Sequence, residues 1–304
     1  MSERPVQQRV RLRSITPEGA YHRLVLDAGQ VARTAQPGQF VALSVGGADS
    51  AMLLRRCFSI AGRREGGIEL LIAARGKGST WLTQRRPGTS LDVIGPLGGP
   101  FPPAPRRAGV VLVGGGYGAA PLLWFAEELI ARGRAASTVQ LVLGAASQDR
   151  LAGVEQARAL GAGVHVTTDD GSAGIAGRVT AAVPAALAAA RREAPRESRP
   201  APGSAPAAGS GSAETAGPPV EVYACGPMAM LRAVSEVAAE HGSPTWCAVE
   251  ESMACGVGVC MTCVLPIRGA DGVVRNLRTC TDGPTFDARA IVWDQIPSLT
   301  GGSR

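Results

Sequence analysis

Short apolar or alternating segments, separated by turn residues, occupy the first third of the chain. They cover residues 10–15, 23–26, 40–45, 58–60, 68–73 and 91–94, with Pro-Gly, Gly-Gly and Pro-Leu-Gly pieces between them. Period-two alternation punctuated by turns is typical of β-strands. Six such strands with little helical pattern predict a small antiparallel β-barrel over residues 1–103.

The pattern changes to alternating strands and helices from residue 109 onward. Strand-like segments at 110–113, 139–143, 164–167 and 220–223 alternate with helix-like segments at 121–132, 153–160, 179–191 and 229–241. Such alternation predicts an α/β domain with a parallel sheet, here over residues 104–244. The uncharged stretch 109–126 contains several glycines and Pro121, so it fits a strand, a turn and a helix start better than a membrane span.

Two further regions complete the predicted multidomain organisation. Residues 194–219 contain no aromatic and no large aliphatic side chain, which predicts a disordered insertion in the α/β domain. The insertion is expected to be a neutral tract, with a regulatory role as the alternative. Residues 245–304 are expected to form a small C-terminal module.

Composition narrows the expected partners. The formal net charge is +6, and Lys77 is the only lysine among 31 basic residues. The arginines occur as scattered pairs, and Ala, Gly and Pro are abundant, so nucleic-acid binding has little support. No apolar leader-like segment stands at the start, and we expect a cytoplasmic protein without a membrane span.

Four cysteines near the C-terminus carry the strongest chemical signal. Cys255, Cys260 and Cys263 stand in the order C-x4-C-x2-C, and Cys280 follows after sixteen further residues. Three thiolates on one glycine-containing loop, with a fourth from a later segment, are the ligand pattern of a [2Fe–2S] cluster. Small residues such as Gly256 and Gly258 let the backbone wrap closely and direct N–H groups at sulfur.

Two alternatives compete for these cysteines. A structural zinc site also takes four cysteines, but its usual pattern has two C-x2-C pairs, and only one is present here. A disulfide framework is disfavoured because no sign of export is present. The remaining cysteines, Cys57, Cys225 and Cys247, are isolated and are expected to be small core residues by default.

Two motifs in the barrel can hold a phosphate. Arg56-Cys57-Phe58-Ser59 closes a strand, and its arginine and serine can bind a pyrophosphate and a flavin edge. The turn that begins at Gly76 leads into a short predicted helix, whose first N–H groups suit a phosphate. Each motif alone is weak, and their ordered pairing is more specific.

The α/β domain carries glycine turns at strand ends. Gly114-Gly-Gly-Tyr-Gly118 follows a strand and precedes a helix, which is the context in which a dinucleotide pyrophosphate approaches the backbone. Cys225-Gly-Pro-Met228 follows another strand, where its thiol would lie near a nicotinamide. Thr168–Ser172 ends a strand at the same edge, as a polar turn or a ligand contact.

The order of these motifs resembles the ferredoxin–NADP reductase-like flavoprotein superfamily. The C-terminal motif, from Met253 to Cys263 and from Cys280 to Phe286, resembles the electron-transfer subunits of NAD-linked dihydroorotate dehydrogenases. The resemblance covers almost the whole chain except 194–219. Phe58 replaces the superfamily's usual flavin-stacking tyrosine, and the insertion is not part of the common pattern.

The resemblance implies cofactors and their residues. It assigns FAD to Arg56, Phe58, Ser59, Gly78, Ser79 and Thr80, NAD(H) to Gly115, Gly116, Gly118, Cys225, Gly226 and Pro227, and the [2Fe–2S] cluster to Cys255, Cys260, Cys263 and Cys280. It also implies a separate FMN-containing catalytic subunit that oxidises dihydroorotate in pyrimidine biosynthesis, with both subunits in a heterotetramer. Electrons would then pass through the cluster and FAD to NAD+, and no residue of this chain is expected to be a catalytic acid or base.

Two other functions remain open from the sequence. The first is an NAD(P)H-dependent reductase subunit of a hydrogenase, sulfide-linked or transhydrogenase complex. The second is a zinc-bearing scaffold protein without enzymatic activity. The loop 144–149 has neither a clear acidic ribose ligand nor a convincing arginine pair, so the choice of NAD over NADP rests on the resemblance.

Overall fold

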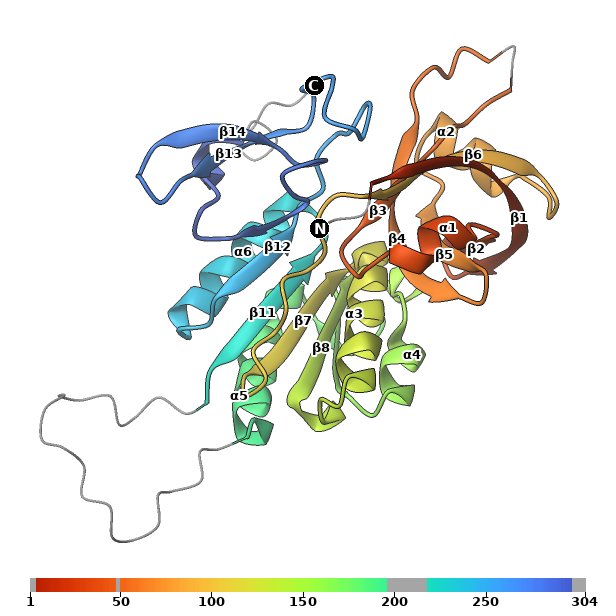
Figure 1. Cartoon of the computed structure of the whole chain (residues 1–304). Coiled ribbons are helices and arrows are strands. Elements are labelled where there is room, and N and C mark those ends of the chain that lie inside the picture. Colours follow the sequence, from red (N-terminus) through yellow and green to blue (C-terminus); the bar gives the residue numbers. More distant parts are fainter. Residues whose placement is uncertain (1–3, 48–49, 196–217, 297–304) are drawn as a thin grey trace, which may run out of the picture.

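A barrel, an α/β sheet and a C-terminal segment lie next to one another in the computed structural model (Figure 1). The structure describes residues 4–47, 50–195 and 218–296. Residues 196–217 of the predicted insertion lie outside this part.

The predicted antiparallel barrel is confirmed. Its six strands close in the order β1-β2-β5-β4-β3-β6, and every neighbouring pair is antiparallel. The strands are β1 (Val6–Glu18), β2 (Tyr21–Leu26), β3 (Phe40–Leu43), β4 (Arg56–Arg64), β5 (Gly67–Ala73) and β6 (Ser90–Leu97). Side chains such as Leu24, Ile60 and Leu70 fill the interior and are fully buried. Two short helices, α1 (Gly29–Thr34) and α2 (Lys77–Thr83), accompany the barrel, and α1 was not predicted.

The α/β prediction is confirmed by a seven-stranded sheet in the order β10-β9-β8-β7-β11-β12-β15. Its strands are β7 (Gly109–Gly115), β8 (Val139–Ala145), β9 (Gly163–Thr168), β10 (Ile175–Ala176), β11 (Val220–Cys225), β12 (Thr245–Ala248) and β15 (Thr285–Asp287). All are parallel except β15, which pairs antiparallel with β12. The chain starts in the sheet at β7, moves outward to β10, and returns to β11 beside β7. The carboxyl ends of β7 and β11 therefore form a topological switch point, where ligands bind in such sheets.

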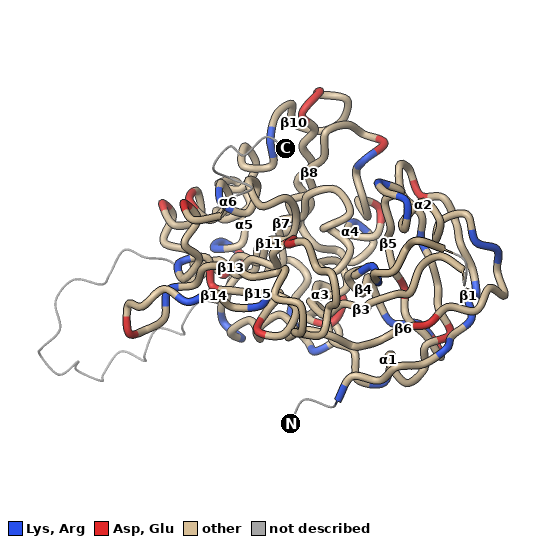
Figure 2. The backbone as a smooth tube through the Cα atoms, turned by 90° about the horizontal axis from the view of Figure 1, so that it is seen from above, with Lys and Arg blue, Asp and Glu red and all other residues tan. Residues whose placement is uncertain are grey.

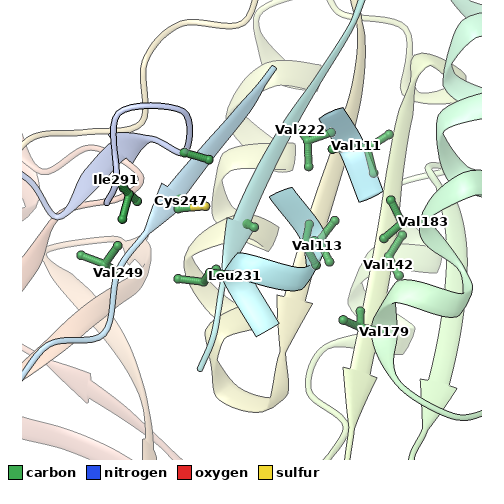
Figure 3. Close-up of a cluster of buried hydrophobic side chains, with 14 of the residues drawn as sticks. Val111, Val113, Val142, Val179, Val183, Val222, Leu231, Cys247, Val249 and Ile291 are labelled. Atoms are coloured by element: carbon green, nitrogen blue, oxygen red, sulfur yellow. The ribbon is translucent and has the colours of Figure 1, made fainter. Parts of the chain in front are cut away.

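Helices cover both faces of this sheet. They are α3 (Ala119–Ala131), α4 (Val154–Ala159), α5 (Val183–Glu193) and α6 (Met228–Glu240), and short 3₁₀ turns cover Gly116–Gly118, Ala136–Thr138, Gln148–Arg150, Val179–Ala181 and Trp293–Gln295. Val183 of α5 and Leu231 of α6 pack on one face, against valines of β7, β8 and β11 (Figure 3). The other face packs against α3, α4 and part of the barrel. Pro121 lies in the first turn of α3, where its missing N–H costs no hydrogen bond.

The C-terminal segment joins the sheet instead of forming a core of its own. It contains the hairpin β13 (Val264–Arg268) and β14 (Val274–Arg278), followed by β15 on the sheet edge. Ile291 belongs to the same buried cluster as Cys247 and Val249 (Figure 3). None of these strands was predicted individually, because they are short and mixed in polarity.

Charged residues are distributed over the whole described surface. Figure 2 shows basic residues on the barrel, the sheet and the C-terminal segment, with acidic residues interspersed among them. Among the described residues, no helix combines the length and the apolar character needed to cross a membrane.

Candidate cofactor cavities and cysteine centre

The β13–β14 hairpin explains how the fourth cysteine reaches the other three. Val264 pairs with Arg278, so the residues just outside the hairpin, Cys263 and Cys280, come together at its open end. The N–H of Thr279 donates to the carbonyl of Cys263 at 2.8 Å and closes this end. Both thiols are almost completely buried, at 2% and 1% exposure.

The other two cysteines lie on the loop that precedes the hairpin. Cys255 is half-buried and Cys260 is exposed. The backbone N–H groups of Val257 and Val259 each donate to Cys255 Sγ at 3.4 Å. The Thr262 hydroxyl donates to Cys260 Sγ at 3.1 Å. Donors directed at sulfur favour thiolate ligands, as an iron–sulfur cluster requires.

Glycine geometry makes this loop possible. Gly256 and Gly258 have φ values of +73° and +83°, a region that other residues adopt at a cost. The four thiols come from two places: Cys263 and Cys280 share one buried cluster, and the more accessible Cys255 and Cys260 lie on the loop before it. Within the described ranges, no three His, Cys, Asp or Glu side chains converge as closely as a single metal ion needs. Four thiols with hydrogen-bond donors directed at sulfur suit the ligand set of an iron–sulfur cluster.

A cavity of about 590 Å³ lies where the barrel meets the sheet. The barrel domain contributes Arg56, Phe58, Ser59 and Ser79 to its wall. The turns at the ends of β7 and β11 contribute Gly118, Cys225 and Gly226, and the segment after β12 contributes residues 250–253. The two barrel motifs that were weak individually are therefore brought together. A largely apolar cavity with two arginines, Arg56 and Arg75, in its wall suits a flavin with its pyrophosphate.

The helix α2 stands directly beside Arg56. A Cβ atom on Gly78 would lie 2.6 Å from Arg56 Nε, so the guanidinium lies against the helix start. The Ser79 hydroxyl accepts hydrogen bonds from the N–H groups of Arg75 and Gly76, at 3.0 Å each. Gly78 lies behind Arg56, and neither Gly78 nor Thr80 is part of the cavity wall.

A second cavity, of about 380 Å³, opens at the carboxyl ends of β7, β8 and β9. Gly115, Gly116 and Pro227 line it, as expected for a nucleotide site. The glycine turn and the Cys225-Gly-Pro turn are in contact, because a Cβ on Gly118 would lie 2.5 Å from the Cys225 carbonyl oxygen. Asp169, Arg150 and Arg178 also line this cavity. The two arginines were missed because they come from separate segments beyond the loop 144–149.

Three residues that were not predicted, Arg75, Tyr117 and Glu250, line both cavities. The Tyr117 hydroxyl donates to the Glu250 carboxylate, and the Arg75 guanidinium lies 5.1 Å from the centre of the Tyr117 ring. Burial, with a further contribution from Glu250, raises the pKa of Tyr117 above its ordinary value. Glu250 follows the end of β12 by two residues. Its position at the carboxyl end of a strand is the sequence signal that could have indicated a place at the ligand site.

Two of the three cysteines expected to be small core residues lie at the cavities. Burial raises the pKa of the Cys225 thiol to about 12, so this thiol is neutral at ordinary pH in the wall of the larger cavity. The prediction that Cys57 is isolated is wrong, because Cys57 packs against the buried cluster that contains Cys263 and Cys280. The register of β3 against β4 sets this contact, and the sequence does not reveal it.

The barrel, the sheet and the paired cavities define a flavoprotein reductase of the ferredoxin–NADP reductase-like fold, extended by a C-terminal cysteine centre. The profile of the iron-sulfur cluster binding domain of dihydroorotate dehydrogenase B matches residues 250–292. The electron transfer subunit of dihydroorotate dehydrogenase B (NAD(+)) from Geobacillus thermodenitrificans is 35% identical over 276 residues, covering 89% of this chain and 92% of that subunit. The chain belongs to this family of dihydroorotate dehydrogenase B electron transfer subunits.

Solved structures agree with this assignment. A structure of an NADH-dependent reduced ferredoxin–NADP oxidoreductase matches with a TM-score of 0.76 and 26% identity, over 97% of this chain and 94% of the other. A ferredoxin NADP+ reductase from Neisseria gonorrhoeae, with bound FAD and NADP, matches the fold with a TM-score of 0.56 and 15% identity, over 78% and 92% of the two chains. The chain is therefore an oxidoreductase subunit with an iron–sulfur cluster domain on an FAD- and NAD-binding type of fold.

Proposed function

We propose that this chain carries electrons from a dihydroorotate-oxidising, FMN-containing catalytic subunit to NAD+, in pyrimidine biosynthesis. The observation that carries the proposal is the arrangement of the sites in a row. The nucleotide cavity shares Arg75, Tyr117 and Glu250 with the flavin cavity, and Cys57 links the flavin cavity to the cysteine centre. A bound flavin exchanges hydride with a nicotinamide and single electrons with an iron–sulfur cluster, which is the conversion this row requires.

Residue roles in the proposal follow the same order along the chain. In this proposal, FAD is held by Arg56, Phe58, Ser59, Gly78, Ser79 and Thr80. NAD(H) is held by Gly115, Gly116, Gly118, Cys225, Gly226 and Pro227. A [2Fe–2S] cluster is held by Cys255, Cys260, Cys263 and Cys280. The corresponding units are 1–103, 104–244 and 245–304. Gly78 and Thr80 are not part of the cavity wall, and the Thr80 N–H donates to the Gly76 carbonyl at 2.9 Å, so their assignment to FAD rests on the resemblance.

The exposed end of the cysteine loop is the proposed docking site of the catalytic subunit. Val259 and Met261, on either side of the exposed Cys260, are 79% and 53% exposed. Apolar side chains around an exposed ligand suit a protein interface, since they gain free energy when covered. We propose a heterotetramer of two such pairs. We place the protein in the cytoplasm, because a reducing environment keeps thiolate ligands available to an iron–sulfur cluster.

The test uses the co-expressed complex and the variant Cys260→Ser. Losing one ligand should remove the cluster's visible absorbance and reduce orotate-coupled NAD+ reduction by more than about 100-fold, which corresponds to about 2.8 kcal/mol at 1.4 kcal/mol per tenfold. Reduction of the flavin by NADH should persist, because the flavin and nucleotide cavities are intact. The matched control is Cys247→Ser, a fully buried thiol outside both cavities. Coupled transfer that survives without a cluster would exclude this electron route.

One observation favours a second candidate. The similarity to the NADH-dependent reduced ferredoxin–NADP oxidoreductase extends over nearly the whole chain. A reductase subunit of another iron–sulfur flavoprotein complex would share the same row of sites. The two functions differ in the partner: a co-purifying subunit that lacks FMN and dihydroorotate oxidation would favour the second.

A further inference from the structure

Cys57 lies between the flavin cavity and the cysteine centre. It is the second residue of β4, between Arg56 and Phe58, and it contributes to the wall of the larger cavity. In the barrel it pairs with Ala42 of β3. Both strands are fixed by the ladder of the closed barrel, so the position of Cys57 is set by the rigid part of the molecule.

The sulfur of Cys57 reaches the cysteine loop. A Cβ atom on Gly256 would lie 3.0 Å from Cys57 Sγ, so the loop backbone passes directly over this thiol. Cys57 also packs against a small buried group formed by Phe40, Ala42, Leu97, Cys263 and Cys280. The thiol therefore adjoins the buried group that contains Cys263 and Cys280, whereas Cys260 is exposed.

Among the residues that the structure describes, three side chains belong both to the cavity wall and to this packing group: Phe40, Cys57 and Met253. Phe40 has no polar hydrogen, and the Met253 thioether can only accept a weak hydrogen bond. Cys57 alone carries an S–H donor. Hydrogen bonds to cluster sulfurs, together with solvent exposure and net charge, set the reduction potential of an iron–sulfur cluster.

We propose that Cys57 is a positioning residue that donates a hydrogen bond to the buried side of the cluster and raises its reduction potential. It is a fifth thiol at the centre, and not a ligand. The outer side has a counterpart, because the Thr262 hydroxyl donates to Cys260 Sγ. The proposal rests on the cluster assigned under the proposed function, and it makes the flavin-binding strand itself part of the cluster's environment.

The experiment is an EPR-monitored redox titration of the full-length protein after anaerobic reconstitution with iron and sulfide. Cys57→Val introduces a β-branched side chain, which suits a strand, and removes the donor. Its cluster should form with the same iron content as the unchanged chain and titrate at a more negative potential. Cys57→Ser keeps a donor, and its potential should lie closer to that of the unchanged chain. Cys247→Ala removes a thiol that belongs to a different buried cluster, and it should leave the potential unchanged.

The outcomes separate this proposal from the proposed function. If the unchanged chain takes up iron without an EPR signal of a reduced cluster, the cluster assignment itself fails. If the cluster forms and Cys57→Val titrates at the original potential, the role of Cys57 is refuted. An equal shift in the Val and Ser variants would also refute it, because packing alone would then explain the change. A cluster that no longer forms in Cys57→Ser would make Cys57 a ligand, which also contradicts the proposal.

Discussion

Two glycine-containing loops, one at the cysteine centre and one at the nucleotide cavity, need particular glycines for different reasons. In the cysteine loop, Gly258 has a φ of +83°, so the backbone conformation itself requires glycine. In the nucleotide loop, Gly118 has an ordinary helical φ of −62°, but a Cβ there would lie 2.5 Å from the Cys225 carbonyl oxygen. Gly258 lets the cysteine loop bend around sulfur, and Gly118 lets two chain segments touch.

The largest effect is expected for Gly118→Ala. The added methyl meets backbone on the far side, at the Cys225 carbonyl and the Gly226 nitrogen, and backbone cannot move aside cheaply. We expect a loss of about 3 kcal/mol in the free energy of unfolding, and a large loss of NADH affinity because the switch point opens. Urea unfolding and an NADH titration measure both. Gly29→Ala is the control, since its Cβ would make only an ordinary contact at 3.5 Å.

Gly258→Ala should have a smaller and more local effect. The left-handed backbone costs about 1–2 kcal/mol for a residue with a Cβ. The nearest atom, Thr281 Cγ2 at 2.7 Å, belongs to an exposed side chain that can rotate away. We expect lower iron content after reconstitution with unchanged flavin content. Gly133→Ala shares a positive φ of +88° with no atom within 4 Å, so it should cost similar stability and leave the iron content unchanged.

The smallest effect is expected for Tyr117→Phe, inside the nucleotide loop. It removes the hydroxyl that donates to Glu250, and it keeps the ring beneath Arg75. Because Glu250 is exposed, water can replace the lost donor, and stability should change by less than about 1 kcal/mol. Thermal unfolding measures this change. A loss as large as that of Gly118→Ala would mean that the hydroxyl, and not the glycine, holds the loop.

The sequence predicts these loops well and explains them poorly. Strand alternation and glycine turns were enough to predict the barrel and the parallel sheet, and cysteine spacing was enough to predict the cysteine loop, because each of these signals is local. The reason for Gly118 is not local: its neighbour Cys225 lies on a strand that comes much later in the chain. The same holds for the wall formed by Arg75, Tyr117 and Glu250, which come from three separate elements.

Short elements were also beyond the sequence signal. The strand β15 has three residues, and no periodicity can be read from so few. The proximity of Cys57 to Cys280 depends on strand register and on the path of a later loop, and neither can be predicted from the sequence pattern around these residues. Patterns thus predict which elements form, whereas contacts between distant elements decide what each residue does.

The pairing of β15 with β12 also bears on solubility. The sheet ends on one side at β10, with two residues, and on the other at β15, with three. Edge strands this short offer few free N–H and C=O groups, so a strand of another chain can form few hydrogen bonds with the edge of the sheet. A fragment ending before Thr285 would expose β12, whose residues Cys247 and Ala248 are buried in the complete chain. By covering β12 with the short strand β15, the C-terminal segment thus limits self-association of the sheet, independently of the cofactor that the segment binds.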